Sequence, residues 1–510
     1  MYVEVVLLVL LGIVYTTTAF IRHRNRFQNF PKGPSGIPIF GYLPFLGKVP
    51  CQTLAELSKT YGKIFSLKLG QYTVVFIHDF ELAKDAYRSE FLTGREQLAL
   101  FEKRGVYGLG LLEGRQWQEL NRFVMKCLRD LGFGKKSLQS SIMEEVVQTR
   151  SLLEKNTNKP LYLKPLIELA VVNALWGIIT SEKYDIEDPT KRHALEIMSD
   201  GIADQNIVGI AAFLPWLAKL FPTYTGYTKG LRYFEAPEQL VKEVVQKHVD
   251  SYVPGTEKDF IDVMLTKIYS TTEPSSMFYK NVGMKNLHYT LIDLFFAGSD
   301  SMSSTLGWSF LYLSMWPEVQ KKVQREIDAV IGPLRLPSSE DKSRLPYTEA
   351  TMWEVLRKSS MVPLGLLHTA TDNFKFEGYF FPRKTIFLTN LHFIHQDPLY
   401  WKDPENFRPE RFINANGQFQ RDEHMIPFFI GKRVCPGESL ALQEYFLFFS
   451  GILQKFEFSL NPDEPVPDIG PRAGQKQSAA FGALWTSLQR ICSSSAPGIN
   501  RTAGWLKELL

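Results

Sequence analysis

One cysteine near the end of the chain lies in a pattern that could bind a metal. Phe428, Gly431, Arg433, Cys435 and Gly437 are spaced as F-x-x-G-x-R-x-C-x-G. A thiolate is a soft, electron-rich ligand, and on the iron of a haem it favours cleavage of an O–O bond. The two glycines permit a tight turn whose backbone N–H groups can point at the sulfur. Arg433 could pair with a haem propionate, and Phe428 could shield the sulfur from water.

Taken alone, Cys435 is more simply a buried free thiol, because buried cysteine usually behaves as a small hydrophobic residue. The complete ten-residue spacing reverses that preference. It resembles the signature of the cytochrome P450 family, which has few chance matches. The resemblance implies haem b (iron protoporphyrin IX) as the cofactor and Cys435 as the axial ligand of its iron.

Composition favours one large globular unit over several domains. The chain has 510 residues, no internal repeat and no long Gly/Ser- or Pro-rich linker after about residue 50. A net charge of +4 is too small for this length to indicate a nucleic-acid partner. Cys51, Cys127, Cys435 and Cys492 are far apart and lack CxxC spacing, which argues against a disulfide scaffold or a zinc site. A reducing compartment is the simpler assignment.

The first residues predict a membrane anchor. Residues 5–21 are almost wholly apolar and have about the length of a minimal membrane span. Arg22, Arg24 and Arg26 follow at once, and basic residues stay on the cytosolic side. We therefore expect the body of the protein to face the cytosol, and the family resemblance implies that the membrane is that of the endoplasmic reticulum. The alternative, a cleaved secretory signal, would need a basic start and a small-residue cleavage site.

Four segments are expected along the chain. They are a transmembrane anchor (1–21), a basic and Pro-rich linker (22–50), a haem-thiolate catalytic domain (51–490) and a C-terminal tail of unknown role (491–510).

The pattern of apolar residues predicts a mainly α fold with a minor β portion. Residues 65–69 and 73–77 form a hairpin pattern, and strand patterns return near residues 375–379 and 385–387. The longest helical pattern covers about residues 284–315 and stops at Pro317.

An apolar stretch at residues 207–221 has two interpretations. It contains Phe213, Leu214, Trp216 and Leu220. It is either the end of a core helix or a lid over a substrate channel that dips into lipid, because exposed apolar patches mark contact sites.

The long helix carries Ala297-Gly298-Ser299-Asp300-Ser301. A glycine inside a helix costs about 1 kcal/mol relative to alanine, and a flat cofactor or O2 passing close to the backbone would explain it. Asp300 beside a hydroxyl could relay protons; the alternative is a kinked helix with a solvated aspartate. The P450 family has A-G-x-D/E-T here, so Ser301 replaces threonine. Serine keeps the hydroxyl but loses the methyl group that fixes its rotamer.

Glu354 and Arg357 form an E-x-x-R pair, which by itself is common on solvated helices. Together with the downstream R-P-E-R-F sequence it resembles two further P450 elements. The resemblance implies that Glu354, Arg357 and Arg411 form a buried, structural charge cluster.

From about residue 31 to about residue 488 the chain resembles a microsomal cytochrome P450, with most similarity to the animal family-2 clan. Residues 117–136 and 344–350 support that clan. The resemblance implies a single large haem-thiolate fold preceded by a membrane anchor helix.

By alignment with the family, Arg95, Trp117 and His368 would contact the haem propionates. Each would otherwise be an ordinary surface or core polar residue. The family has an arginine four residues after the tryptophan, where this chain has Asn121. Either the propionate is held less strongly or Arg122 reaches round.

No fused electron-transfer domain is indicated, because Gly108, Gly110 and Gly114 lack the spacing of a dinucleotide-binding loop. Electrons would come from NADPH–cytochrome P450 reductase, with cytochrome b5 as an additional candidate. A basic docking face for an acidic donor is one interpretation of several lysines and arginines, and a scattered solvated surface is the other. These residues are Lys126, Arg129, Lys135, Lys136 and Lys432.

The resemblance implies a monooxygenase that inserts one atom of O2 into a lipophilic small molecule, with Asp300 and Ser301 assisting protonation. A steroid, a fatty acid, a terpenoid or a xenobiotic would suit an apolar pocket. The implied pocket ranges are 99–111, 207–213, 295–297, 362–366 and 480–481.

Two alternatives remain open. A haem-thiolate isomerase or dehydratase would take a peroxide substrate without a reductase, and Ser301 and Asn121 mildly favour it. A non-catalytic haem carrier or sensor is the other.

Overall fold

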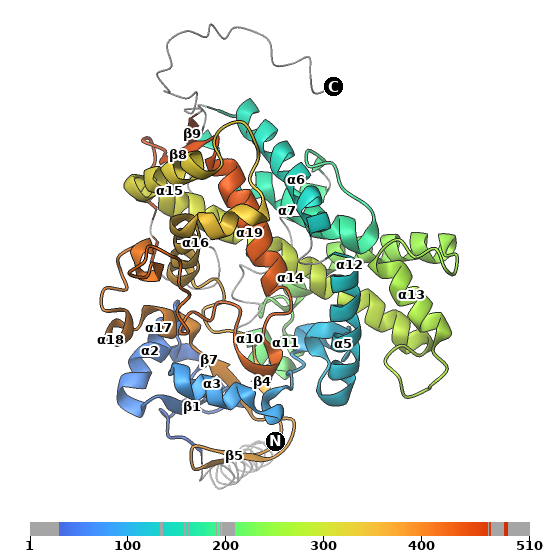
Figure 1. Cartoon of the computed structure of the whole chain (residues 1–510). Helices are drawn as coiled ribbons and strands as arrows, with labels where there is room; N and C mark the ends of the chain where they lie inside the picture. Colours follow the sequence, from blue (N-terminus) through green and yellow to red (C-terminus); the bar gives the residue numbers. More distant parts are fainter. Residues whose placement is uncertain are drawn as a thin grey trace, which may run out of the picture.

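A computed structural model describes residues 30–132, 136–157, 160–161, 163–189, 191–193, 195, 210–467, 469–470 and 484–487. Within these ranges the chain is mainly helical with a few short strands, so the expected fold class is confirmed (Figure 1). The expected anchor (1–21) and tail (491–510) lie outside the described residues. Of the helices that are described, none is long and apolar enough to cross a bilayer.

The α-helices carry most of the fold. They are α2 (Pro50–Tyr61), α3 (Phe80–Arg88), α4 (Gly108–Leu111), α5 (Gly114–Asp130), α6 (Lys136–Lys155), α7 (Leu163–Thr180), α10 (Ile210–Phe213), α11 (Pro215–Leu220), α12 (Tyr227–Ser251), α13 (Phe260–Ser270), α14 (Lys280–Met315), α15 (Pro317–Val330), α16 (Pro346–Ser359), α17 (Leu391–Gln396), α18 (Pro398–Trp401) and α19 (Glu438–Leu453). Short 3-10 turns are η1 (Leu43–Phe45), η2 (Glu90–Leu92), η3 (Ala99–Phe101), η4 (Ser339–Arg344), η5 (Pro409–Phe412) and η6 (Gly431–Arg433).

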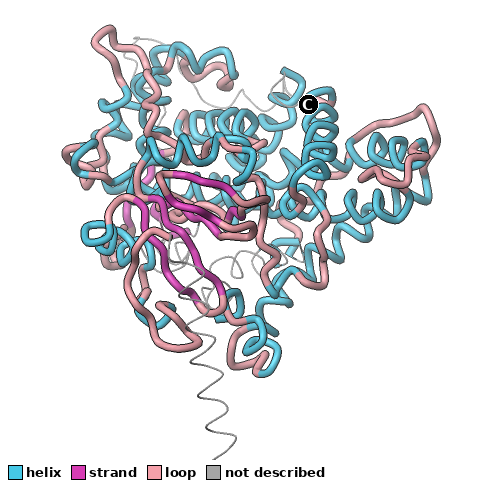
Figure 2. The backbone as a smooth tube through the Cα atoms, turned by 90° about the horizontal axis from the view of Figure 1, so that it is seen from below, coloured by secondary structure: helices cyan, strands magenta, loops and turns pink. Residues whose placement is uncertain are grey.

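The strands form three small sheets, and Figure 2 shows several of the strands side by side at the left of the view. They are β1 (Ile64–Leu69), β2 (Tyr72–Ile77), β3 (Pro160–Leu161), β4 (His368–Thr369), β5 (Phe374–Phe376), β6 (Tyr379–Phe381), β7 (Ile386–Thr389), β8 (Glu457–Leu460) and β9 (Leu484–Ser487). The sheet orders are β1-β2-β7-β4, β3-β9-β8 and β5-β6.

The predicted hairpin is confirmed, with β1 and β2 antiparallel and Leu69 opposite Tyr72. The sheet is completed from far along the chain, because β2 pairs in parallel with β7. On its other side β7 pairs antiparallel with β4, so His368 lies in the same sheet as the hairpin.

The long helix α14 crosses the middle of the molecule (Figure 1). It begins one turn earlier than the sequence indicates and ends at Met315, as expected from Pro317. Most of its side chains are buried, including nearly every residue from Met302 to Ser314. A helix buried all round is a core helix, so α14 is the axis on which the other elements pack.

The chain between residues 30 and 50 packs against the hairpin. The Ser66 hydroxyl donates to the carbonyl of Pro31 at 2.7 Å, and the backbone N–H of Tyr42 donates to the carbonyl of Lys68 at 2.6 Å. The described part of the expected linker is thus tied to β1 by hydrogen bonds.

The apolar stretch near residue 215 has a buried part and an exposed part, and its role as a lid that dips into lipid stays a prediction; residues 207–209 lie outside the described ranges. Phe213, Leu214 and Ala218 are buried. Trp216 and Leu220, both on α11, are 48% and 63% exposed. One face of α10–α11 belongs to the core, and the other is an exposed apolar surface.

A histidine–aspartate pair joins α12 to α13. His248 Nε2 lies 2.9 Å from Asp259 Oδ2, and His248 Nδ1 lies 2.8 Å from the carbonyl of Val244. Burial alone would lower the pKa of His248, but these hydrogen bonds outweigh it and raise the pKa to about 9.

Replacing His248 with glutamine is therefore expected to destabilise the protein in a pH-dependent way. The folded pKa lies above the usual value of 6.5, so the pair stabilises fully below that pH and the stabilisation is lost as pH rises through about 9. We expect a loss of about 2 kcal/mol near neutral pH, reduced by solvent screening. Thermal unfolding across this range checks it; an equal loss at all pH values would contradict it.

Candidate functional site

The cysteine of the signature lies just before the first turn of α19. Its backbone N–H donates to the carbonyl of Phe428 at 2.9 Å, which closes the loop. Burial raises the pKa of the Cys435 thiol, whereas hydrogen bonds from the backbone of Gly437 and Glu438 lower it. These N–H groups stand at a helix N-terminus, where negative charge is favoured. The expected set of backbone donors aimed at the sulfur is therefore present.

The two glycines of the signature have different roles. Gly431 has φ +83°, and a Cβ there would lie 2.1 Å from the carbonyl oxygen of Tyr87. The close approach of the loop to α3 is sufficient to require glycine there. At Gly437 a Cβ would meet the Cys435 sulfur at 3.9 Å, an ordinary contact. No atom of the described residues lies close enough to Gly437 to clash with a Cβ at that position.

The side chains that were predicted to bind the haem propionates lie close together. They are Arg95, Trp117, His368 and Arg433. The guanidinium of Arg433 lies 4.4 Å over the Trp117 ring, and its Nη1 and Nη2 donate to the carbonyls of Leu112 and Gly110 at 3.0 and 3.1 Å. Arg95 donates to the carbonyl of Leu367 at 2.9 Å. The neighbouring residue, His368, is 1% exposed.

Positive charge is concentrated at this point. Burial and then the charge of Arg95 lower the pKa of Arg433 to about 8. Burial lowers the pKa of Arg95 to about 10. Burial followed by the charge of Arg95 holds the pKa of His368 well below its usual range. An anionic group that binds at this point would raise the pKa of all three side chains again.

The donor set fits a ligand that carries carboxylates. His368 Nε2 is buried and has no hydrogen-bond partner within the described chain. Within the described residues, the hydrogen bonds of Arg95 and Arg433 go to backbone carbonyls and not to a carboxylate. Buried guanidinium groups are normally paired, so an external dianion would complete this cluster. The two propionates of haem b meet that requirement.

Sequence reasoning missed the aromatic side chain of the signature that faces this cluster. Phe429 stacks on the His368 ring with centroids 4.8 Å apart and meets the Tyr87 ring at 4.7 Å. Phe428, which was expected to shield the sulfur, packs against the main hydrophobic core. The sequence shows two adjacent phenylalanines, Phe428 and Phe429, but does not indicate which ring faces the site.

One face of α14 is open. Between residues 286 and 314 only Ala297 and Ser301 are exposed. They are one turn apart, so they share a face of the helix. The Ser301 hydroxyl donates to the carbonyl of Ala297 at 2.7 Å. Ser301 therefore presents a hydroxyl on an accessible surface within an otherwise buried helix.

Asp300 does not share that face. Its Oδ1 lies 2.6 Å from the Nζ of Lys164 on α7, and both side chains are almost fully buried. The solvated aspartate considered from the sequence is thus wrong. A lysine 136 positions away in the chain could not be found from local spacing.

Gly298 also faces α7. A Cβ there would lie 2.4 Å from Leu175 Cδ2, so the glycine allows two helices to pack closely. The expected passage of a cofactor or O2 along the helix backbone stays a prediction.

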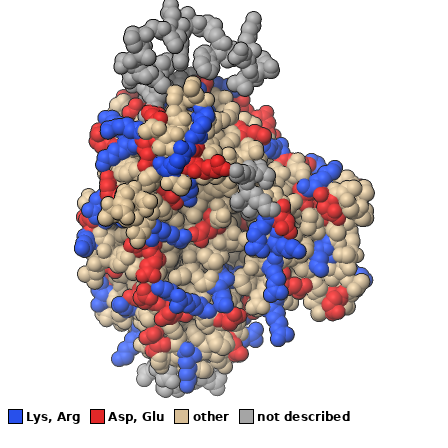
Figure 3. Space-filling model, viewed as in Figure 1, with Lys and Arg blue, Asp and Glu red and all other residues tan. Residues whose placement is uncertain are grey.

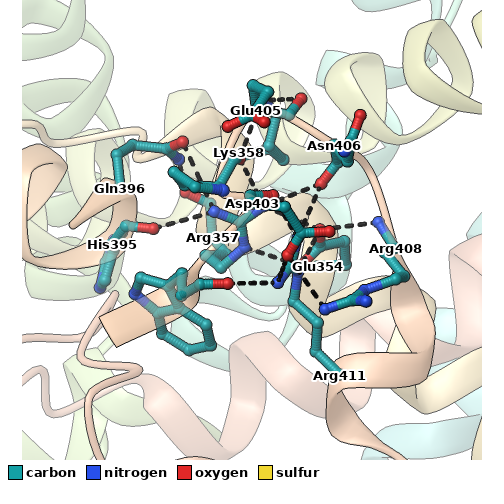
Figure 4. A network of polar contacts seen from close by, with 12 residues as sticks. Glu354, Arg357, Lys358, His395, Gln396, Asp403, Glu405, Asn406, Arg408 and Arg411 are labelled. Carbon is teal, nitrogen blue, oxygen red and sulfur yellow. Dashed lines mark hydrogen bonds and ion pairs between the residues drawn. The ribbon is translucent and has the colours of Figure 1, made fainter. Parts of the chain in front are cut away.

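The predicted charge cluster is confirmed and is larger than expected (Figure 4). Arg357 binds both oxygens of Glu354 at 2.8 Å, and Arg411 Nε lies 3.3 Å from Glu354 Oε1. Asp403 pairs with Arg411 at 2.7 Å. Backbone carbonyls of His395 and Pro404 accept the remaining Arg357 hydrogens at 2.9 Å. The cluster ties α16 to the chain that leads towards the cysteine loop.

The segments expected to line an apolar pocket only partly converge. Residues from 98–101, α10 and 364–367 share one hydrophobic cluster with the hairpin. Phe295 instead packs on Trp176 of α7, with ring centroids 5.0 Å apart. Residues 480–481 lie outside the described ranges.

The expected basic face is present in part. Lys126 and Arg129 are exposed on α5, together with Arg115 and Arg122. Figure 3 shows Lys and Arg side chains gathered over this helix. Lys432 forms an ion pair with Glu90 at 3.0 Å. The side chains of residues 135 and 136 lie outside the description.

The exposed Arg122 stands beside Asn121, which is partly buried. Whether either residue contacts a propionate stays a prediction.

Residues 31–480 match the family described as Cytochrome P450, so the chain belongs to the cytochrome P450 family. Members of this family bind haem b through a cysteine thiolate, and the protein is a cytochrome P450 monooxygenase.

Curated relatives place the chain near family 2, as expected. It is 34% identical to cytochrome P450 2L1 of Panulirus argus over 84% of this chain and 90% of the relative. It is 33% identical to cytochrome P450 2J2 of Homo sapiens over 88% and 90%. It is 31% identical to farnesoate epoxidase of Bombyx mori over 90% and 94%.

Proposed function

We propose that this protein is a membrane-associated monooxygenase that oxidises a lipophilic small molecule with electrons from NADPH–cytochrome P450 reductase. Cys435 is the iron ligand in this proposal. The observation that carries it is the cluster of Arg95, His368 and Arg433, which lacks a carboxylate partner in the described chain and stands beside the cysteine loop. When bound, haem supplies the activation of O2.

The residues of the chain divide the remaining tasks. Arg95, His368 and Arg433 hold the propionates, with Trp117 and Phe429 packed against them. The loop from Phe428 to Gly437 orients the sulfur and donates hydrogen bonds to it. Ser301 offers a hydroxyl on the open face of α14, where a proton would be delivered. Asp300 would join this delivery only if its ion pair with Lys164 opened.

We assign electron delivery to the basic face of α5, the helix that carries Trp117. Arg115, Arg122, Lys126 and Arg129 are exposed there. Such a surface suits an acidic electron donor, and it steers association rather than adding affinity. NADPH–cytochrome P450 reductase is the proposed donor, and cytochrome b5 is a second.

Membrane association is supported by exposed apolar side chains around the β1–β2 turn. The carbonyls of Phe40 and Phe213 accept hydrogen bonds from Gly70 and Gln71 of this turn, both at 3.0 Å. The adjoining segments expose several large apolar residues. These are Ile37, Ile39, Phe45, Trp216, Leu220 and Phe221. We place this surface against the membrane of the endoplasmic reticulum.

The substrate is proposed to be apolar. Leu366 is 62% exposed and Val362 is 37% exposed, close in sequence to His368. One relative is called a farnesoate epoxidase, so farnesoate is a suitable first compound in a screen with steroids, fatty acids and xenobiotics.

The function is tested by reconstitution with reductase in lipid vesicles. We expect NADPH consumption and O2-dependent product formation that both require the reductase. Product formed from a peroxide substrate without reductase would favour the isomerase or dehydratase alternative. Haem binding without any turnover would favour a carrier.

Replacing Ser301 with alanine is expected to lower product formed per NADPH consumed by roughly tenfold to a hundredfold, because the hydroxyl on the open face is lost. The KM should change little, and Ser301→Thr serves as the matched control that keeps the hydroxyl. Equal coupling in the alanine and threonine variants would contradict this role.

A further inference from the structure

The first residue of α19 acts on the cysteine sulfur in two opposite ways. Glu438 is three residues after Cys435, and its backbone N–H donates a hydrogen bond to the sulfur. Its carboxylate carries a negative charge and has the opposite effect. Burial raises the pKa of the Cys435 thiol most, and the charge of Glu438 raises it further. The carboxylate is therefore close enough for its charge to act on the sulfur.

An arginine from the segment before the cysteine loop neutralises this carboxylate. Arg421 Nη1 lies 2.7 Å from Glu438 Oε1. The two side chains are 41% and 24% exposed, so water and salt screen the pair only in part. The charge that Glu438 places beside the sulfur is thus balanced by a single neighbouring cation, which is seventeen positions away in the chain.

Two further contacts hold the arginine in place. Its guanidinium lies 4.4 Å over the ring of Trp353, and its Nη2 donates to the carbonyl of Met425 at 3.3 Å. A cation over the face of a tryptophan ring is attracted by the ring quadrupole. Trp353 is 2% exposed and stands on α16 directly before Glu354 of the buried charge cluster. Arg421 is therefore oriented by a rigid part of the core as well as by its carboxylate partner.

The position of this pair connects it with reduction of the iron. A negative charge near a haem iron stabilises the ferric state, because ferric iron carries one more positive charge than ferrous iron. Hydrogen bonds to the ligand sulfur and the groups that surround it also tune the iron. A Glu438 carboxylate without its counter-charge would therefore make the iron harder to reduce.

We propose that Arg421 is a positioning residue that neutralises Glu438 beside the axial sulfur and so sets how readily the haem iron accepts an electron. The step concerned is the one-electron reduction of ferric to ferrous iron, with the electron supplied by the reductase. The pair contributes only its charges to this step, and no bond or proton of either side chain changes. This inference rests on the proposed function, because it takes Cys435 as the iron ligand.

The test is a redox titration of the full-length, haem-loaded protein, followed by its absorption spectrum in the absence of reductase and substrate. Arg421→Gln removes the counter-charge, Glu438→Gln removes the carboxylate, and the double variant removes both charges. Lys84→Gln is the matched control. Lys84 pairs at 3.0 Å with Glu423, which lies two residues from Arg421, so this variant also removes one cation from an ion pair of the same segment.

We expect Arg421→Gln to shift the equilibrium between ferric and ferrous protein towards the ferric state by roughly threefold to tenfold, where tenfold is about 59 mV for a one-electron couple. Glu438→Gln should shift it by a similar factor in the opposite direction, because the charge of Arg421 is then left unbalanced. The double variant should return close to the parent, since two neutral side chains replace a neutral pair. Lys84→Gln should match the parent.

Three results would overturn the proposal. One is a potential equal to that of the parent in both single variants. Another is a shift in the same direction in both. A merely structural pair would give the third, in which haem content falls while the potential of the remaining haem-loaded protein stays unchanged.

If Arg421→Gln fails to retain haem, the other two variants decide. Glu438→Gln must raise the potential, and the double variant must cancel that rise; a double variant as high as Glu438→Gln would overturn the proposal. The potential is read without turnover. A protein with the expected shifts but no reductase-driven oxidation would therefore refute the proposed function and retain the role of Arg421. Reductase-driven oxidation with unshifted potentials would do the reverse.

Discussion

Replacing Cys435 with alanine is expected to abolish monooxygenation and the thiolate character of the bound haem. No other cysteine is available for the site within the described chain, since Cys51 and Cys127 are buried elsewhere. The propionate donors Arg95, His368 and Arg433 do not depend on the sulfur. The variant should therefore still bind haem, with weaker retention.

The measurement is the absorption spectrum of the reduced protein under carbon monoxide, together with haem content. We expect the long-wavelength band of a thiolate-ligated haem in the parent and its complete loss in Cys435→Ala. Cys127→Ala is the matched control, because it removes another buried thiol and should leave the band unchanged. A thiolate band that survives in Cys435→Ala would show that a different residue binds the iron.

Replacing Glu354 with glutamine is expected to cost about 3–5 kcal/mol of folding free energy, since it removes the one carboxylate that serves two buried arginines. Arg357 is fully buried and Arg411 nearly so, and both bind Glu354. Asp403 pairs with Arg408 and Arg411 but not with Arg357, so Arg357 would be left without a carboxylate. The backbone N–H of Arg408 would also lose the charge of its acceptor, Glu354 Oε1 at 2.8 Å.

Thermal unfolding and haem retention measure this loss. A suitable control is Glu318→Gln on α15, where Glu318 and Lys321 form an exposed pair at the same three-residue spacing. That control should leave the stability nearly unchanged, because an exposed pair contributes little. Similar losses in both variants would contradict a buried, structural role for the Glu354 cluster.

Local patterns predicted those features that depend on near neighbours. The hairpin of β1 and β2 follows from two short apolar runs around a turn. The end of α14 follows from Pro317. The family motifs gave the Glu354 cluster and the residues around Cys435, because each motif fixes residue types as well as spacing.

Contacts between distant segments could not be predicted. Asp300 was expected beside the hydroxyl of Ser301, yet on a helix adjacent residues point in directions about 100° apart. The Asp300 side chain points towards α7 because it pairs with Lys164 there. Likewise, the sequence could not show that Gly298 packs against Leu175 or that Gly431 packs against the backbone of Tyr87. A glycine in a sequence shows that space is limited without showing what limits it.

The central claim is a bond between the sulfur of Cys435 and haem iron, and X-ray absorption at the iron edge observes that bond directly. For the purified ferric protein we predict one sulfur in the first coordination shell of iron, along with the porphyrin nitrogens. This sulfur should be absent in Cys435→Ser. A first shell made only of nitrogen and oxygen in the parent protein would contradict the account.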